Sequence, residues 1–191
     1  MNPCAAAMSL AVLCSSGWAQ TFSSAPIRTP SAAEIATPPM PYYDAEQALQ
    51  GVYRHRLPAL AKAFEQSSAQ LVSRTEAHCQ GQAPLAELRR QWQQTLVHWQ
   101  TLSSPELGPL VARRSLREID FWPTRERLLR QALEKAPQTL AEMERVGSPA
   151  KGFPALERLL TTGPGSALAP ATCHYAGLVA QGIEAEAVSY T

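Results

Sequence analysis

Apolar residues recur at helical spacing along most of the chain, and this pattern restricts the fold to helices. In a predicted helix over residues 84–102, one stripe consists of Leu85, Leu88, Trp92, Leu96 and Trp99. Charged and amide side chains take most of the remaining positions, so the helix has one apolar face. The same spacing predicts a helix that ends near residue 79 and further helices over residues 123–135, 137–145, 153–160 and 171–189.

Sustained alternation of apolar and polar residues, which β-strands require, does not occur in the sequence. Each predicted helix buries a single stripe and therefore needs neighbouring helices. The predicted fold class is all-α, an antiparallel helical bundle. Trp92 and Trp99 lie seven residues apart on one stripe and are expected in its core. The last helical segment reaches the C-terminus with no stop signal, which predicts a domain that is cut short.

The N-terminal segment resembles a signal peptide. The first 27 residues carry no charged side chain, and residues 5–13 form an apolar run too short to span a bilayer. Gly17 and Ala19 place small residues where a signal peptidase requires them. We therefore expect a cleaved signal peptide over residues 1–19 and export to the periplasm or cell envelope. The alternative is a lipoprotein signal with Cys14 as the lipidated residue, although the preceding Leu13 is bulky.

Composition separates the rest of the chain into two parts. Residues 20–41 are rich in Ser, Thr, Ala and Pro, which predicts a flexible spacer. Residues 42–191 contain the helical pattern and form the predicted domain. The formal net charge of +1 gives no electrostatic basis for binding nucleic acid or an anionic membrane surface. Contact with a membrane is thus expected only through the signal or a lipid anchor.

Two cysteines remain after the predicted signal, Cys79 and Cys173. An even pair in an exported protein is a candidate disulfide. Two buried free thiols are the alternative, and metal binding by a pair so far apart in sequence is less favoured. No HExxH motif, phosphate-binding loop, GxSxG or GxGxxG motif occurs in the sequence.

Three short segments are more distinctive than the surrounding helices. They are REIDFWP at residues 117–123, KGFPALERLL at residues 151–160, and Cys-His-Tyr at residues 173–175. Their order, together with the helix of Trp92 and Trp99, resembles imelysin-like proteins. The resemblance runs from about residue 43 to residue 189 and covers the N-terminal half of that family's domain.

The resemblance implies a fold, a location and a biological setting. Imelysin-like proteins are built from two helical bundles and lie in the periplasm or on the bacterial envelope, and some are linked to iron uptake. By this resemblance the chain would supply the first bundle, Cys79 and Cys173 would be bonded, and envelope or iron-uptake proteins would be its partners. The cofactor stays unknown at this point, with iron or another divalent metal as the open candidate.

The family's proposed metal or catalytic motif, GxHxxE, is altered in this sequence. The matching positions are Gly152, Pro154 and Glu157, so a proline stands where the family has histidine. Proline has no side-chain donor or metal ligand, and the proposed centre cannot form as written. We therefore expect a non-enzymatic envelope protein with an iron-related binding or uptake role. A metal-dependent peptidase and a truncated copy with a structural role are the alternatives.

The predicted ligand site is a polar cleft formed where the two longer motifs meet. Its residues are Arg117, Asp120, Trp122, Gly152 and Glu157. Arg117 and Asp120 are three residues apart and can pair on a helix surface. Such a cluster can equally be structural, and Glu157 can serve as a buried acceptor or as an ordinary carboxylate near a helix start. The FWP segment is expected to plug the core, with a ligand wall as the alternative.

Overall fold

The computed structural model describes residues 44–106, 108–162 and 167–191, and the regular structure in these ranges is helical throughout. This confirms the all-α prediction. The signal peptide and spacer predicted for residues 1–41 lie outside the described residues. Within the described ranges, no helix combines the length and apolar character needed to cross a bilayer.

The helices follow the predicted order. The first, α1 (Ala45–Gly51), continues through a π-helical stretch, Val52–Arg56, into α2. A short 3-10 turn, Ser148–Ala150, precedes α8. The remaining elements are α2 (Leu57–Cys79), α3 (Leu85–Ser103), α4 (Pro109–Ala112), α5 (Ser115–Ile119), α6 (Glu126–Lys135), α7 (Leu140–Met143), α8 (Gly152–Thr161) and α9 (Pro170–Val188).

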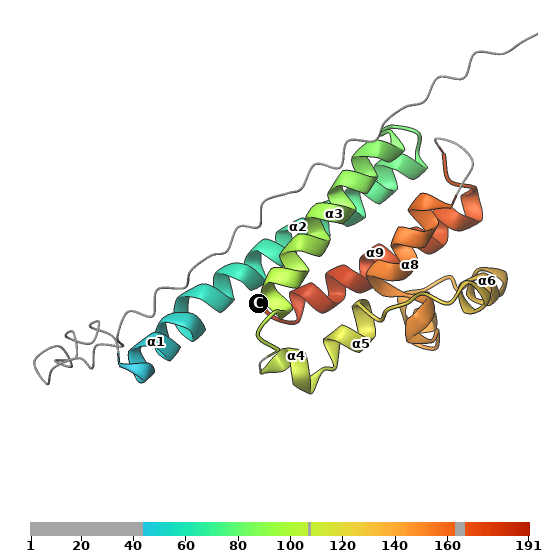
Figure 1. The fold of residues 1–191 in the computed structure, drawn as a ribbon. Helices are drawn as coiled ribbons and strands as arrows, with labels where there is room; N and C mark the ends of the chain where they lie inside the picture. Colours follow the sequence, from blue (N-terminus) through green and yellow to red (C-terminus); the bar gives the residue numbers. More distant parts are fainter. Residues whose placement is uncertain (1–43, 107, 163–166) are drawn as a thin grey trace, which may run out of the picture. The chain divides into compact units, whose positions relative to one another are not determined.

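Helices α2, α3, α8 and α9 pack as a bundle (Figure 1). Helix α2 packs against α3 and α9, and α8 packs against α9 and α3. Their core is aromatic: the ring centroid of Phe64 lies 5.4 Å from that of Trp99 and 6.4 Å from that of Phe153, and all three side chains are fully buried. Trp92 is also buried, so both tryptophans predicted in the core lie there.

A glycine turn connects α2 to α3. The N–H of Gly81 donates to the His78 carbonyl at 2.9 Å, and the N–H of Gln82 donates to the Ala77 carbonyl at 2.8 Å. These two bonds satisfy carbonyls left open by the helix end and form a Schellman motif. The motif needs a left-handed backbone, which Gly81 supplies with a φ of +74°. The turn reverses the chain into the α2–α3 hairpin.

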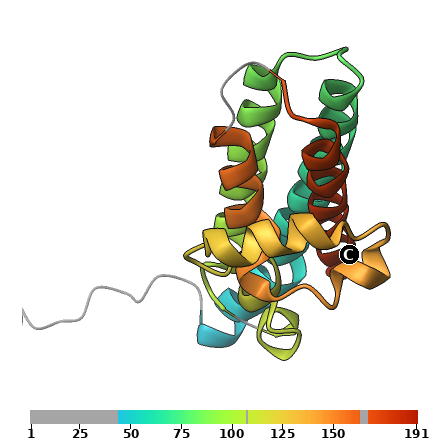
Figure 2. The ribbon, with the colours of Figure 1, turned by 90° about the vertical axis from the view of Figure 1, so that its right-hand side faces the viewer.

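Helices α4–α7 form a connecting segment between α3 and α8, and α6 runs across the bundle helices in Figure 2. Ser104 and Pro105 form a turn after α3, and the next helix begins at Pro109. Gly108, directly before it, has a φ of +54°, which a right-handed helix cannot include.

The Cys79–Cys173 disulfide is formed, which confirms the predicted pairing. The two Cα atoms lie 5.7 Å apart, and the disulfide joins the end of α2 to the first turn of α9. The start of α9 therefore lies beside the end of α2, and the two helices run antiparallel. Helix α9 is buried on several sides, since it packs against α2, α5, α6, α7 and α8.

Reduction of this disulfide should lower the stability of the folded protein. The bridge closes a loop of 94 residues, and long loops restrict the unfolded chain strongly. We expect dithiothreitol, or the double substitution Cys79→Ser and Cys173→Ser, to decrease the free energy of unfolding by about 2–4 kcal/mol. Urea denaturation followed by circular dichroism measures this. Equal stability in the oxidised and reduced states would contradict it.

Candidate functional site

The REIDFWP and KGFPALERLL segments meet at Gly152, the first residue of α8. Gly152 is buried and has a φ of +72°. A Cβ atom at this position would lie only 2.2 Å from the carbonyl oxygen of Ile119. Glycine alone allows this approach, because it lacks a side chain and tolerates the left-handed backbone. Beside the contact, Lys151 Nζ forms an ion pair with Glu118 Oε2 at 2.7 Å. The two motifs are thus parts of one site.

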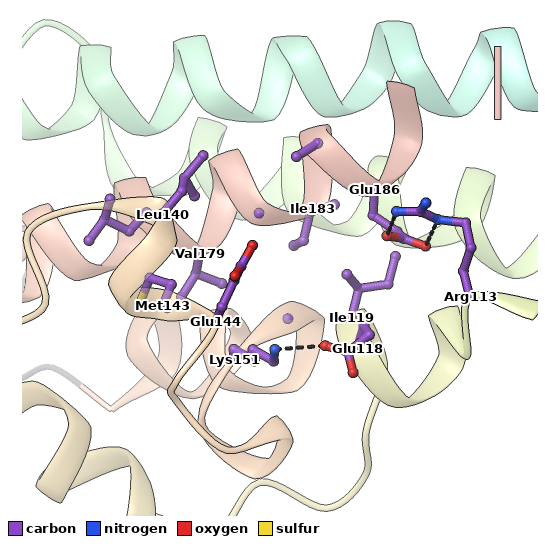
Figure 3. A pocket seen from close by; sticks show the side chains of 14 residues that line it. Arg113, Glu118, Ile119, Leu140, Met143, Glu144, Lys151, Val179, Ile183 and Glu186 are labelled. Carbon is purple, nitrogen blue, oxygen red and sulfur yellow. Dashed lines mark hydrogen bonds and ion pairs between the residues drawn. The ribbon is translucent and has the colours of Figure 1, made fainter. Parts of the chain in front are cut away.

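A cleft with a volume of about 420 Å³ opens beside this contact (Figure 3). Helices α5, α7 and α9 and the start of α8 surround it. The volume falls within the range of small-molecule sites in proteins. Its apolar lining includes Ile119, Leu140, Met143, Leu178, Val179 and Ile183, and its charged lining consists of Arg113, Glu118, Glu144, Lys151 and Glu186.

Glu186 is the most strongly bonded of these charged groups. Arg113 donates to both of its oxygens, Nε to Oε1 at 3.2 Å and Nη2 to Oε2 at 3.0 Å. The hydroxyls of Ser115 and Tyr190 donate to Oε1 at 2.6 and 2.7 Å. Burial opposes ionisation of the carboxyl, but these donors outweigh it and hold the pKa of Glu186 below its usual value. Glu186 therefore anchors α9 to the segment that contains α4 and α5.

Glu144 differs from the other carboxylates of the cleft. It follows α7 directly and is exposed. Its carboxylate forms no ion pair or hydrogen bond with the described residues, whereas Glu118 and Glu186 each have a cationic partner. Figure 3 shows this carboxylate over the middle of the cleft, near Val179 and Ile183 in that view.

Asp120, one of the predicted site residues, does not line the cleft. Helix α5 ends at Ile119, and Asp120 leaves the helix with φ −139° and ψ 41°. Its carboxylate accepts hydrogen bonds from the indole N–H groups of Trp99, at 2.8 Å, and Trp122, at 2.6 Å. Burial raises the pKa of Asp120, although these two hydrogen bonds act in the opposite direction. No ion pair joins Asp120 to Arg117 in the part of the chain that the structure describes.

Of the predicted residues Gly152, Arg117 and Trp122, only Gly152 lies at the cleft. Gly152 lines the cleft, but Arg117 is exposed and lines a different hollow together with Leu110 and Arg114. Trp122 is 51% exposed, so the expectation that it plugs the core was wrong. Its indole N–H is held by Asp120 at the surface. The structure therefore brings the two motifs together, but not through Arg117 and Trp122.

The positions that match the metal motif do not fit a metal ion. Pro154 is buried in the first turn of α8 and offers no ligand atom. Glu157 lies three residues further along α8 and is half-buried. Among the described residues, no group of three or more His, Cys, Asp or Glu side chains is arranged to hold a metal. We therefore derive no metal-dependent step for this site.

Sequence reasoning missed all five charged residues of the cleft, which are Arg113, Glu118, Glu144, Lys151 and Glu186. Glu118 belongs to the REIDFWP motif and Lys151 begins the KGFPALERLL motif. Their place in these motifs was the sequence signal that could have indicated them as site residues. Glu186 is a charged residue at a helical position otherwise occupied by apolar side chains, which suggests a buried, partnered group. Arg113 and Glu144 carry no comparable sequence signal.

Substitution of Gly152 should separate the two motifs. We expect Gly152→Ala to destabilise the protein by more than about 2 kcal/mol, because the added Cβ overlaps the Ile119 backbone and the φ is left-handed. The matched control is Gly182→Ala in α9, where a Cβ meets nothing within 4 Å. The control should gain about 0.5–1 kcal/mol from helix propensity. Thermal denaturation compares the two, and similar midpoints for both variants would exclude the close contact.

Comparison with known proteins agrees with the sequence motifs. The family model described as Imelysin matches residues 57–187, which include both longer motifs and both bonded cysteines. An imelysin-like protein from Psychrobacter arcticum 273-4 has a similar fold, with a TM-score of 0.63 and 20% sequence identity. The match covers 74% of this chain and 46% of that one, so the chain spans less than half of the similar structure. No curated protein matches significantly. The chain belongs to the imelysin family.

Proposed function

We propose that this chain is an exported, non-enzymatic binding protein of the imelysin family that holds a ligand in the cleft between α5, α7, α8 and α9. One observation carries the proposal: the two most distinctive motifs of the sequence meet at Gly152 and Ile119, and both residues line the cleft. A pocket with an apolar wall and a few converging polar groups is the usual form of a small-molecule site.

The chemistry of the motif favours binding over peptide hydrolysis. A metallopeptidase needs ligands that hold a metal ion and polarise water. Pro154 supplies no such ligand, and it is fixed in the first turn of α8. The iron-related role that the family resemblance implies enters the proposal as a biological setting. The partners of the chain would be envelope or iron-uptake proteins. Pro154 and Glu157 would not hold a bare metal ion.

Two features support export. Residues 5–13 and the small residues Gly17 and Ala19 have the pattern of a cleaved signal. The Cys79–Cys173 disulfide is a bond that persists in oxidising compartments and is rare in the cytosol.

Processing of the chain tests the proposed location. We expect the mature protein, isolated from the periplasmic fraction of the native cell, to begin at Gln20, because Gly17 and Ala19 fit the peptidase that cleaves before it. N-terminal sequencing and intact mass measure this. A chain that retains Met1 and remains in the cytosol would refute the proposed export.

Filling the cleft tests the proposed binding role. Gly182 lines the cleft and has open space around its Cβ position, so Gly182→Leu should fill the cleft without disturbing the helix. The matched control is Gly177→Leu, since Gly177 lies on the same helix, has equally open space and lines a different hollow. We expect mass spectrometry of protein isolated from the native envelope to find a bound small molecule in the wild type and in the control, but not in Gly182→Leu.

Two outcomes would contradict this proposal. One is a bound small molecule that survives Gly182→Leu, or the lack of any such molecule in all three proteins. The other is a stoichiometric metal in the wild type that is lost from Glu157→Ala, which would instead favour the metal-dependent peptidase.

A further inference from the structure

The charges that line the cleft are not balanced. Two cations, Arg113 and Lys151, lie among three carboxylates, Glu118, Glu144 and Glu186. Each cation already has a carboxylate partner, Lys151 with Glu118 at 2.7 Å and Arg113 with Glu186 through two hydrogen bonds. An anionic ligand would therefore have to displace a bonded carboxylate to reach either cation. The cleft carries one negative charge in excess, on Glu144.

The excess charge lies beside apolar surface. Val179 and Ile183 of α9, Met143 of α7 and Ile119 of α5 line the cleft. These side chains offer no coordinating oxygen, so a hydrated metal ion would gain little from them. An aliphatic or aromatic group, in contrast, would lose contact with water there, which favours binding.

We infer that the cleft binds an organic cation, an ammonium or guanidinium group attached to an apolar body, with Glu144 as its counter-ion. This inference rests on the proposed binding function of the cleft and specifies its ligand class. The Glu144 carboxylate accepts hydrogen bonds from the cationic head, and the apolar body lies against Val179 and Ile183. Glu118, whose side chain is 42% exposed, presents a second acceptor at the same rim.

A series of six-carbon probes tests the ligand class. Hexylammonium, hexanol and hexanoate share one apolar body and differ in the charge of the head group. Isothermal titration at pH 7 and low salt should give saturable binding of hexylammonium, weaker binding of hexanol and no binding of hexanoate. Added salt should weaken only the binding of hexylammonium, since its ion pair with an exposed carboxylate is screened.

A matched pair of variants tests the counter-ion. Glu144→Gln removes the charge at an exposed position and keeps the shape of the side chain. We expect it to weaken hexylammonium binding about two- to fivefold, because water weakens an ion pair with an exposed carboxylate. The control is Glu134→Gln, which removes an exposed carboxylate on α6 outside the cleft and should leave the affinity unchanged.

The outcomes separate this inference from the proposed function. Suppose that hexanol or hexanoate binds more tightly than hexylammonium and that this binding is lost in Gly182→Leu. This result would overturn the cationic ligand class and leave the binding role intact. Equal hexylammonium affinity in the wild type and Glu144→Gln would overturn the assignment of the counter-ion. No hexylammonium binding to the wild type would overturn the inference, while the binding role would still be decided by the ligand extracted from the envelope.

Discussion

The close approach of Gly152 to the Ile119 backbone is the constraint on which the site depends. Helix α8 begins at this glycine and α5 ends at this isoleucine, so the contact joins the bundle to its connecting segment. It places Lys151 beside Glu118 and leaves the cleft open along α9. Any side chain at residue 152 would push α5 outward. The site therefore follows from a backbone contact rather than from a cluster of reactive side chains.

Two carboxylates, the half-buried Asp120 and the buried Glu186, secure the connecting segment in different ways. Asp120 is bonded by neutral indole donors of Trp99 and Trp122, and its pKa is raised by burial. Glu186 is bonded by the guanidinium of Arg113 and by two hydroxyls, and its pKa is lowered despite burial. The first ties the end of α5 to α3, and the second ties α9 to the residues around α4. Helices of four and five residues have little stability of their own, so these anchors hold them in place.

The long elements could be predicted from sequence, whereas the cleft could not. Apolar stripes such as Leu88, Trp92 and Trp99 predict the helices, because a helix that buries one face has apolar residues at this spacing. The direction of side chains in α5 was not predictable, since one residue along a helix turns the side chain by about 100°. For this reason Arg117 was predicted in the site, whereas its neighbour Glu118 is the residue that lines the cleft. Nor does any local pattern reveal that Asp120 leaves the helix to meet Trp99.

Nuclear Overhauser contacts in the oxidised protein test the central claim most directly. If Gly152 packs on the Ile119 backbone, the α-protons of Gly152 should show a strong cross-peak to the α-proton of Ile119, two residues far apart in sequence. This cross-peak reports the backbone contact itself and does not depend on any ligand. Its absence, with Gly152 contacts to other segments instead, would show that the two motifs do not meet and that the cleft is not formed.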